Sequence, residues 1–167
     1  MRRILPTLAL VMLAGATLAG CTAEPPIPDN AEVQAWAAEA QQRSADAPDA
    51  LAMAAGATGP EATNQEATAE GAGTIIDFAE PVHVDNVVLT CFGEGTVTIA
   101  LTVTSATKTM SLGDNVVSCA DGDHVVDFSG SNIGPATKLE VNDVGASQIG
   151  YWSATAHGTR ATAAPAG

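Results

Sequence analysis

The chain has 167 residues, six of them basic and 19 acidic, which gives a formal net charge of −13 at pH 7. Nucleic acids are bound through lysine and arginine, so this balance predicts that the protein has no nucleic-acid partner. The length allows one domain with short extensions.

The N-terminus has the parts of a secretory signal peptide. Residues 2–3 are both arginine, and residues 4–16 form an apolar stretch that is too short to span a bilayer as a helix. Leu18-Ala19-Gly20-Cys21 follows. These four residues resemble the lipobox of bacterial lipoproteins that signal peptidase II processes. The resemblance implies a signal peptide over residues 1–20 and lipidation of Cys21. The alternative is an ordinary secretory signal with an incidental cysteine.

Lipidation would decide where the mature protein is held. Each buried methylene contributes about 0.8 kcal/mol, so several palmitate-like acyl chains on one cysteine give a stable anchor. Removal of residues 1–20 leaves four basic residues against 19 acidic ones, so lipid rather than charge would provide the attachment. We expect the protein to be lipid-anchored on the extracytoplasmic face of the cell membrane.

Two further cysteines, Cys91 and Cys119, form an even pair in a compartment that is expected to be oxidising. A disulfide between them would close a loop of about 28 residues and stabilise the fold by roughly 3–4 kcal/mol. The alternatives are two buried free thiols or a metal-binding pair.

A short tether and a helix are expected after the anchor. Residues 21–28 contain three prolines and predict a stiff tether, and Asp29 with Glu32 resembles a capping box. Residues 29–47 are rich in good helix formers. Their apolar residues form one narrow stripe: Val33, Trp36, Ala37 and Ala40. The expected helix is a weakly docked spacer, and the alternative is that Trp36 anchors a partner.

Residues 48–73 predict a disordered linker. Pro48 ends the helical pattern, and Leu51 and Met53 are the large apolar residues that interrupt a run of Ala, Gly, Thr, Glu and Pro. Such a segment buries too little surface to offset the entropy cost of ordering. With the helix, it would make a spacer of about 50 residues between membrane and domain.

Residues 74–157 predict an all-β domain. In residues 96–104 apolar side chains alternate strictly with Thr and Ala, which is the period of a half-buried strand. Other stretches fit strands at 75–78, 83–91, 107–112, 116–119, 124–128, 137–144 and 149–156. Turn residues separate them at 93–95, 113–115, 121–123 and 129–135. About eight short strands favour a small antiparallel β-sandwich of jelly-roll type.

The inward positions of these strands give the expected core. It comprises Ile76, Phe78, Val87, Leu89, Val97, Ile99, Leu101, Val126, Phe128, Leu139, Val141 and Trp152. This core is modest, so we expect the disulfide to matter for stability. Residues 158–167 are small and polar and predict a disordered tail.

A second, looser resemblance covers residues 74–157. Cys91-Phe92-Gly93-Glu94-Gly95 precedes a strand, Cys119 follows, and Tyr151-Trp152 lies on the last strand. The pattern resembles the small secreted β-sandwich lipoproteins of actinobacteria, most of which have no known function. It implies a fold and a location only.

Few side chains point to chemistry. Asp121 and Asp123, with Asp127 nearby, are weak candidates for a calcium site, although they do not match an EF-hand loop. The three histidines, His83, His124 and His157, would bind zinc or copper only if the fold gathered them. Neither group is a predicted metal site, and no cofactor is expected.

The sequence lacks a catalytic motif, and we expect no enzymatic activity. In residues 145–150 the second glycine comes one position too late for a Gly-x-Ser-x-Gly nucleophile elbow. The leading hypothesis is therefore a non-enzymatic binding module that contacts an envelope protein or a glycan. One alternative is a carbohydrate-binding module that uses Tyr151 and adjacent loops, because an exposed aromatic ring stacks on sugars. The other is a metal-dependent protein or enzyme that uses the histidines and the aspartates at 121–127.

Overall fold

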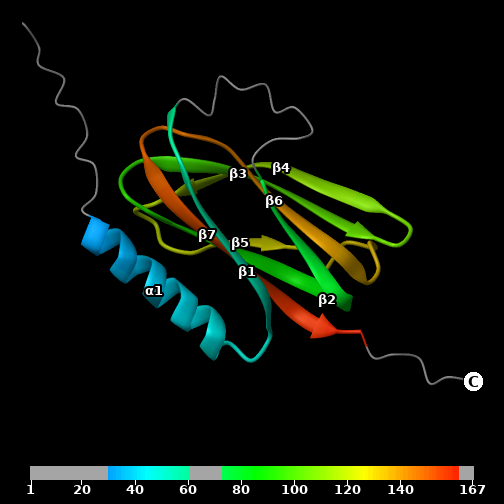
Figure 1. The fold of residues 1–167 in the computed structure, drawn as a ribbon. Helices are drawn as coiled ribbons and strands as arrows, with labels where there is room; N and C mark the ends of the chain where they lie inside the picture. The colour runs from blue at the N-terminus through cyan, green and yellow to red at the C-terminus, as the bar shows by residue number, and fades with distance from the viewer. Residues whose placement is uncertain (1–29, 61–72, 162–167) are drawn as a thin grey trace, which may run out of the picture.

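The computed structural model describes residues 30–60 and 73–161 (Figure 1). Within these residues, one helix precedes seven strands. In chain order they are α1 (Asn30–Asp46), β1 (Ala50–Thr58), β2 (Thr74–Phe92), β3 (Thr96–Ser105), β4 (Thr109–Ser118), β5 (His124–Asp127), β6 (Ala136–Ala146) and β7 (Gly150–Arg160). The expected signal peptide (residues 1–20), the expected tether (residues 21–28) and residues 162–167 lie outside the described residues.

The strands form one antiparallel sheet that folds over at β2 into two layers. The strand order is β1-β7-β2-β6-β3-β4, with β5 also paired to β2. Residues 74–82 of β2 pair with β6, whereas residues 82–92 pair with β7. We call β1, β7, β5 and residues 82–92 the front layer, and β6, β3, β4 and residues 74–82 the back layer. The all-β, sandwich-like fold predicted from the sequence is confirmed.

Strand β2 bends at a point where the sequence predicted a break between two strands. Pairing with β6 is interrupted between Asp77 and Val82. Pro81 lies in this stretch and has no N–H to donate to a neighbouring strand. The chain changes layers here without leaving strand conformation, so the expected strands at 75–78 and 83–91 are one strand.

The core fills the space between the two layers. In β3 alternate residues from Val97 to Ser105 are buried, as the period of two predicts. Ile76 and Phe78 are only partly buried and pack against the core, while the other expected core residues are buried. The disulfide between Cys91 of the front layer and Cys119 of the back layer is present, with an S–S distance of 2.06 Å.

The expected linker over residues 48–73 is wrong for its first part. Residues 50–58 form β1, which pairs with β7 from Ala50↔His157 to Thr58↔Gly150. The small side chains that suggested disorder allow β1 to fit against the bulky core residue Trp152, which lies opposite Gly56. Tertiary packing therefore overrides a low intrinsic strand preference. Residues 61–72 of the expected linker lie outside the described residues.

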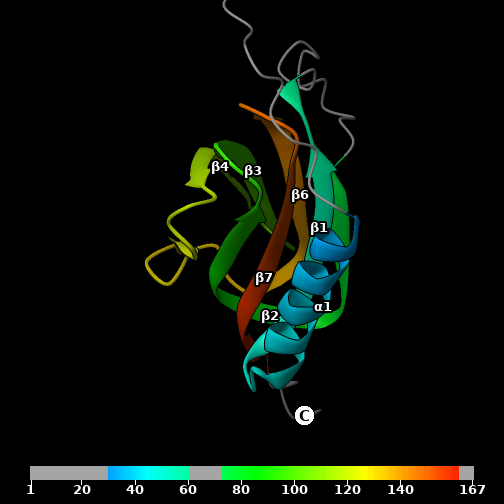
Figure 2. The same cartoon turned by 90° about the vertical axis from the view of Figure 1, so that its left-hand side faces the viewer.

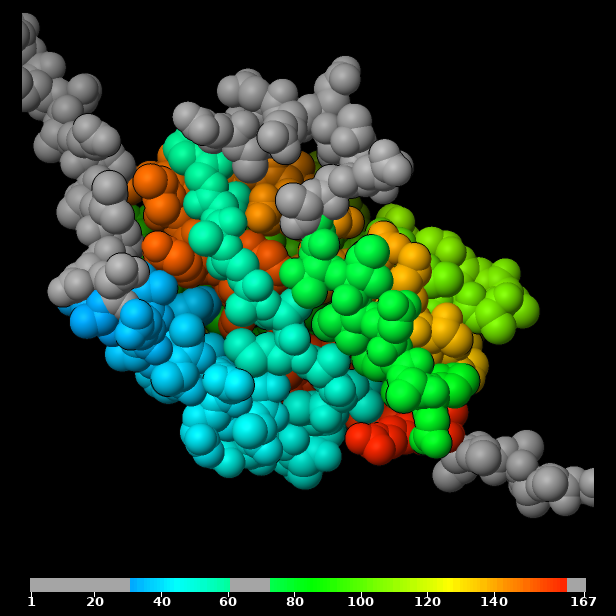
Figure 3. Space-filling view, viewed as in Figure 1, coloured from blue at the N-terminus to red at the C-terminus, as the bar shows by residue number. Residues whose placement is uncertain are grey.

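The helix predicted at 29–47 is confirmed at Asn30–Asp46, but it is not a separate spacer. Ala40 is buried, and the rings of Trp36 and Phe92 are 5.8 Å apart. Figure 2 shows α1 on the side of the front layer that faces away from β3 and β4, and Figure 3 shows α1 and β1 side by side on the surface. The expected spacer of about 50 residues is thus wrong, because most of it belongs to the folded body.

Two other expected boundaries change. The disordered tail predicted from residue 158 is wrong for its first residues, because β7 continues to Arg160 and the Gly158 N–H donates to the Asp49 carbonyl oxygen; residues 162–167 lie outside the described residues. The turn expected at 113–115 is a bulge inside β4. Ile99 pairs with Asn115 and Leu101 with Leu112, so Gly113 and Asp114 of β4 lie opposite the single residue Ala100 of β3, and β4 has one extra residue.

Candidate functional site

The candidate acidic site is an exposed turn and strand end. Asp121, Asp123 and Asp127 are all exposed. The backbone N–H of Ser129 donates to Asp127 Oδ1 at 2.8 Å. Hydrogen bonding to the side chain of Ser129, and then to its backbone, holds the pKa of Asp127 below its usual value. Within residues 30–60 and 73–161, no three metal-ligating side chains come together.

The three histidines lie on different parts of the front layer. His83 and His124 are exposed, on β2 and at the start of β5. His157 on β7 is largely covered, and its Nδ1 lies 3.1 Å from Asp49 Oδ1. The hydrogen bond to His157 is the main reason why the pKa of Asp49 is lowered. This contact fixes the segment between α1 and β1 against β7.

The aromatic residues of β7 point to opposite faces, as expected. Trp152 is buried in the core and only 3 % exposed. Tyr151 is half-buried on the outer face, between Ala57 of β1 and Phe92 of β2. It lines neither of the two depressions described next, so the structure adds no support to a sugar site built around Tyr151.

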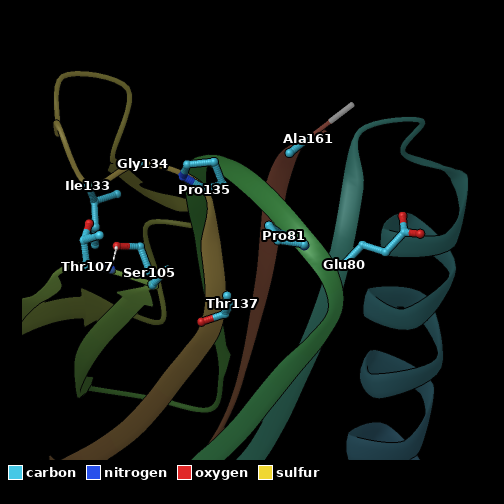
Figure 4. A pocket seen from close by; sticks show the side chains of 10 residues that line it. Glu80, Pro81, Ser105, Thr107, Ile133, Gly134, Pro135, Thr137 and Ala161 are labelled. Atoms are coloured by element: carbon cyan, nitrogen blue, oxygen red, sulfur yellow. Dashed lines mark hydrogen bonds between the residues drawn. The ribbon is translucent and has the colours of Figure 1, made fainter. Parts of the chain in front are cut away.

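The first depression, here called the end cleft, lies where the bend of β2 meets the ends of β3, β6 and β7. It has a volume of about 490 Å³. Its lining is largely apolar and comes from Pro81, Ala106, Ile133, Pro135 and Ala161, with Glu80, Ser105 and Thr107 adding polar groups. Figure 4 shows that these residues come from separate elements, and that the Glu80 side chain points away from the others.

Local turns hold the walls of the end cleft. Ser105 Oγ accepts hydrogen bonds from the N–H groups of Thr107 and Lys108, at 3.4 and 3.0 Å, which tightens the β3–β4 turn. Ala161 N–H donates to the Pro81 carbonyl oxygen at 3.0 Å and fixes the end of β7 beside the bend of β2. The cleft is therefore preformed rather than a gap between loose loops.

The second depression, here called the helix–sheet groove, runs between α1 and the outer face of the front layer and has a volume of about 230 Å³. Arg43 and Ser44 of α1 form one wall and Asp123 the other. Thr90, Ser153 and Thr155 lie on the strands below, and His157 also lines the groove.

The sequence singled out Asp123 and His157 as members of one alternative metal-dependent site, but it did not indicate that Arg43 and Ser44 lie beside them. The reason is that α1 was expected to lie away from the domain. The apolar stripe of the helix is the feature that could have indicated docking.

Comparisons with protein-family models, with curated proteins and with solved structures found no match. In the part of the chain that the structure describes, no helix has the length and apolar character needed to cross a membrane.

Proposed function

We propose that this chain is a lipoprotein anchored through Cys21 on the extracytoplasmic face of the cell membrane, and that its β-sandwich is a non-enzymatic binding module. One observation carries the proposal: the end cleft lies at the opposite end of the folded body from the place where the chain enters α1. An anchored protein with this arrangement presents its cleft away from the membrane.

The start of α1 and the end cleft lie near opposite ends of strand β7. Near the start of α1, Trp36 packs on Phe92, which pairs with Tyr151 at the beginning of β7. Ala161, which lines the end cleft, comes directly after β7 ends. A strand of 11 residues spans about 36 Å. Figure 1 shows the start of α1 and the end of β7 on opposite sides of the molecule.

The distance to the membrane is limited by chain length. About nine residues separate Cys21 from Asn30, and a fully extended chain of that length reaches about 30 Å. Because α1 is docked on the front layer, this reach applies to the whole body and not to a helix on a free arm. The end of the body near Trp36 is then the end closest to the bilayer.

The cysteines also support an extracytoplasmic location. Cys91 and Cys119 are bonded to each other, which is typical of proteins in oxidising compartments. Neither is available as a free thiol nucleophile, which favours binding over thiol catalysis.

The lining of the end cleft indicates its occupant. Pro81, Ile133 and Pro135 provide apolar surface in the lining of the cleft. Such a surface fits an extended apolar segment of an envelope protein better than a charged small molecule, which would find few partners there.

The anchor is tested by Cys21→Ser. The variant should move from the detergent phase to the aqueous phase in detergent partitioning of cells that express the full chain, because it cannot carry the lipid. Thr22→Ala is the matched control and should stay in the detergent phase. Unchanged partitioning of Cys21→Ser would show that the lipoprotein assignment is wrong.

The cleft is tested separately by Thr107→Arg, which places a charge at its lining. Crosslinking of the anchored protein to its envelope neighbours should lose one product in this variant. Thr109→Arg, an exposed position on β4 outside the cleft, should retain that product. Equal crosslinking by both variants would contradict the end cleft as the binding site.

A further inference from the structure

The outer face of the front layer is unusually polar where a helix covers it. The sheet residues below α1 include Thr90, Ser153 and Thr155, and Ser153 is only 4 % exposed. A helix that merely docks on a sheet would favour apolar residues at these positions, because burial of apolar surface drives such packing. Here the helix contributes Ala40 and Ser44, which leave space above the hydroxyl groups.

The hydroxyl groups of the groove floor suit a ligand that both donates and accepts hydrogen bonds. Thr90 Oγ1 and Ser153 Oγ lie 2.6 Å apart, so one donates to the other. The pair still has one proton and further lone pairs to offer. Thr155 lies next along β7 on the same face, two residues from Ser153.

The two walls of the groove carry side chains of opposite charge. Arg43, whose Nη1 contacts Glu39 at 3.0 Å, offers further guanidinium donors, and Asp123 across the groove offers acceptors. His157 is oriented through its Nδ1 contact with Asp49, which leaves Nε2 as its other polar atom. Val88 and Ala40 provide apolar surface between these groups.

We propose that the helix–sheet groove is a binding site for a single neutral sugar ring. A pyranose has apolar C–H faces and a rim of hydroxyl groups that donate and accept, which matches an apolar strip flanked by hydroxyls, one guanidinium and one carboxylate. A single anion would be repelled by Asp123, and a single cation would be repelled by Arg43. The site is distinct from the end cleft and does not depend on the lipid anchor.

The test uses the full mature chain with its disulfide intact, in a detergent without a sugar headgroup. Glucose, galactose, mannose and N-acetylglucosamine are titrated separately while backbone amide shifts are followed by NMR. At least one should give saturable shifts centred on residues 88–90 and 153–157, with a Kd of about millimolar, as expected for so small a ligand. Glycine and inorganic phosphate, titrated in the same way, should not.

Two variants locate the binding. Thr155→Val removes a hydroxyl group at nearly constant volume and should weaken binding about three- to tenfold. Asp123→Ala, at an exposed turn, should weaken it by a similar factor without affecting folding. Thr102→Val, the same change on β3 of the back layer, is the control and should leave the affinity unchanged. The proposal is overturned if no sugar gives saturable shifts, if glycine or phosphate binds instead, or if Thr155→Val and Asp123→Ala bind as the control does.

Discussion

Gly56 creates the space that Trp152 occupies in the core. A Cβ atom at Gly56 would lie 2.7 Å from Cζ2 of the indole ring, closer than carbon atoms approach without displacement. Trp152 is 3 % exposed, and among the described residues its Nε1 atom has no hydrogen-bond partner. Because no hydrogen bond holds Nε1, the position of the Trp152 ring depends on its packing against Gly56.

Substitution of Gly56 by alanine should destabilise the fold by about 1–3 kcal/mol, because the added methyl group overpacks the core. The measurement is the free energy of unfolding in urea. Gly113→Ala is the matched control, since a Cβ there meets no atom within 4 Å, and its effect should stay within about 0.5 kcal/mol. Equal stability of the two variants would mean that Trp152 moves aside without cost.

The contact between Asp49 and His157 predicts an effect of pH. The pKa of Asp49 in the folded protein is lowered from 3.8, chiefly by the hydrogen bond to His157. A lowered carboxyl pKa contributes stability above the unfolded value, and this contribution is lost as pH falls through the folded value. The sequence pattern alone did not predict this pair, because the two residues are 108 positions apart.

Asp49→Asn should therefore be less stable than the natural chain at neutral pH, and the difference should shrink as pH falls below 3.8. Thermal unfolding followed by circular dichroism over this range measures the difference. Asp85→Asn, an exposed carboxylate on β2, is the control. A difference that stays constant through the acid range would show that the Asp49 carboxylate contributes nothing through its charge.

At the scale of elements, strands with β-branched residues in strict alternation could be predicted and β1 could not. The alternation in β3 reports its burial directly, because Val97, Ile99 and Leu101 face the core. In β1 the sequence Ala-Leu-Ala-Met-Ala-Ala-Gly-Ala-Thr has neither the alternation nor the residue types of a strand. Its conformation is imposed by β7, which is distant in sequence.

The bulge in β4 was missed for a related reason. Gly113 and Asp114 are typical turn residues, and Asp114 adopts a positive φ of 44°. The strand nevertheless continues, because Asn115 Nδ2 donates to the carbonyl oxygens of Ile99 and Leu112, at 3.0 and 3.4 Å. A local pattern indicates that the backbone departs from regular geometry, but not whether the strand resumes its pairing afterwards.

Docking of α1 leads to a prediction for Trp36. Trp36→Ala should lower the free energy of unfolding by about 1–2 kcal/mol, less than for a fully buried tryptophan, because the ring is half-buried against Phe92. Urea unfolding measures the change. Gln41→Ala, on the exposed side of the helix, should have little effect. If Trp36→Ala has no more effect than Gln41→Ala, the helix adds nothing to the stability of the sandwich.

At the scale of the whole molecule, the disulfide joins the two layers at the end of the body near Trp36. Cys91 lies one residue before Phe92, and Cys119 directly follows β4. The double variant Cys91→Ala/Cys119→Ala should lose roughly 3–4 kcal/mol of stability on the chain-entropy model. The measurement is urea unfolding of both proteins under the same conditions. A loss below about 1 kcal/mol would show that packing alone holds the layers together.

The last prediction concerns orientation and combines the docked helix with the proposed anchor. If Cys21 carries lipid, the start of α1 lies within about 30 Å of the anchored residue, whereas the end cleft is displaced by roughly the 36 Å length of β7. A fluorophore on Glu32→Cys should therefore transfer energy to acceptors in the bilayer more efficiently than one on Thr107→Cys. Each new cysteine is the only free thiol expected, since Cys91 and Cys119 are bonded and Cys21 would carry lipid.

The control for this comparison is the same pair of labels on protein with Cys21→Ser, for which energy transfer from both positions should vanish with the anchor. Equal transfer from positions 32 and 107 in the anchored protein would mean that the body lies flat on the membrane. Stronger transfer from position 107 would mean that the end cleft faces the bilayer. Either result would contradict the outward cleft, and only a higher efficiency at position 32 agrees with a module that presents its binding site to the space outside the membrane.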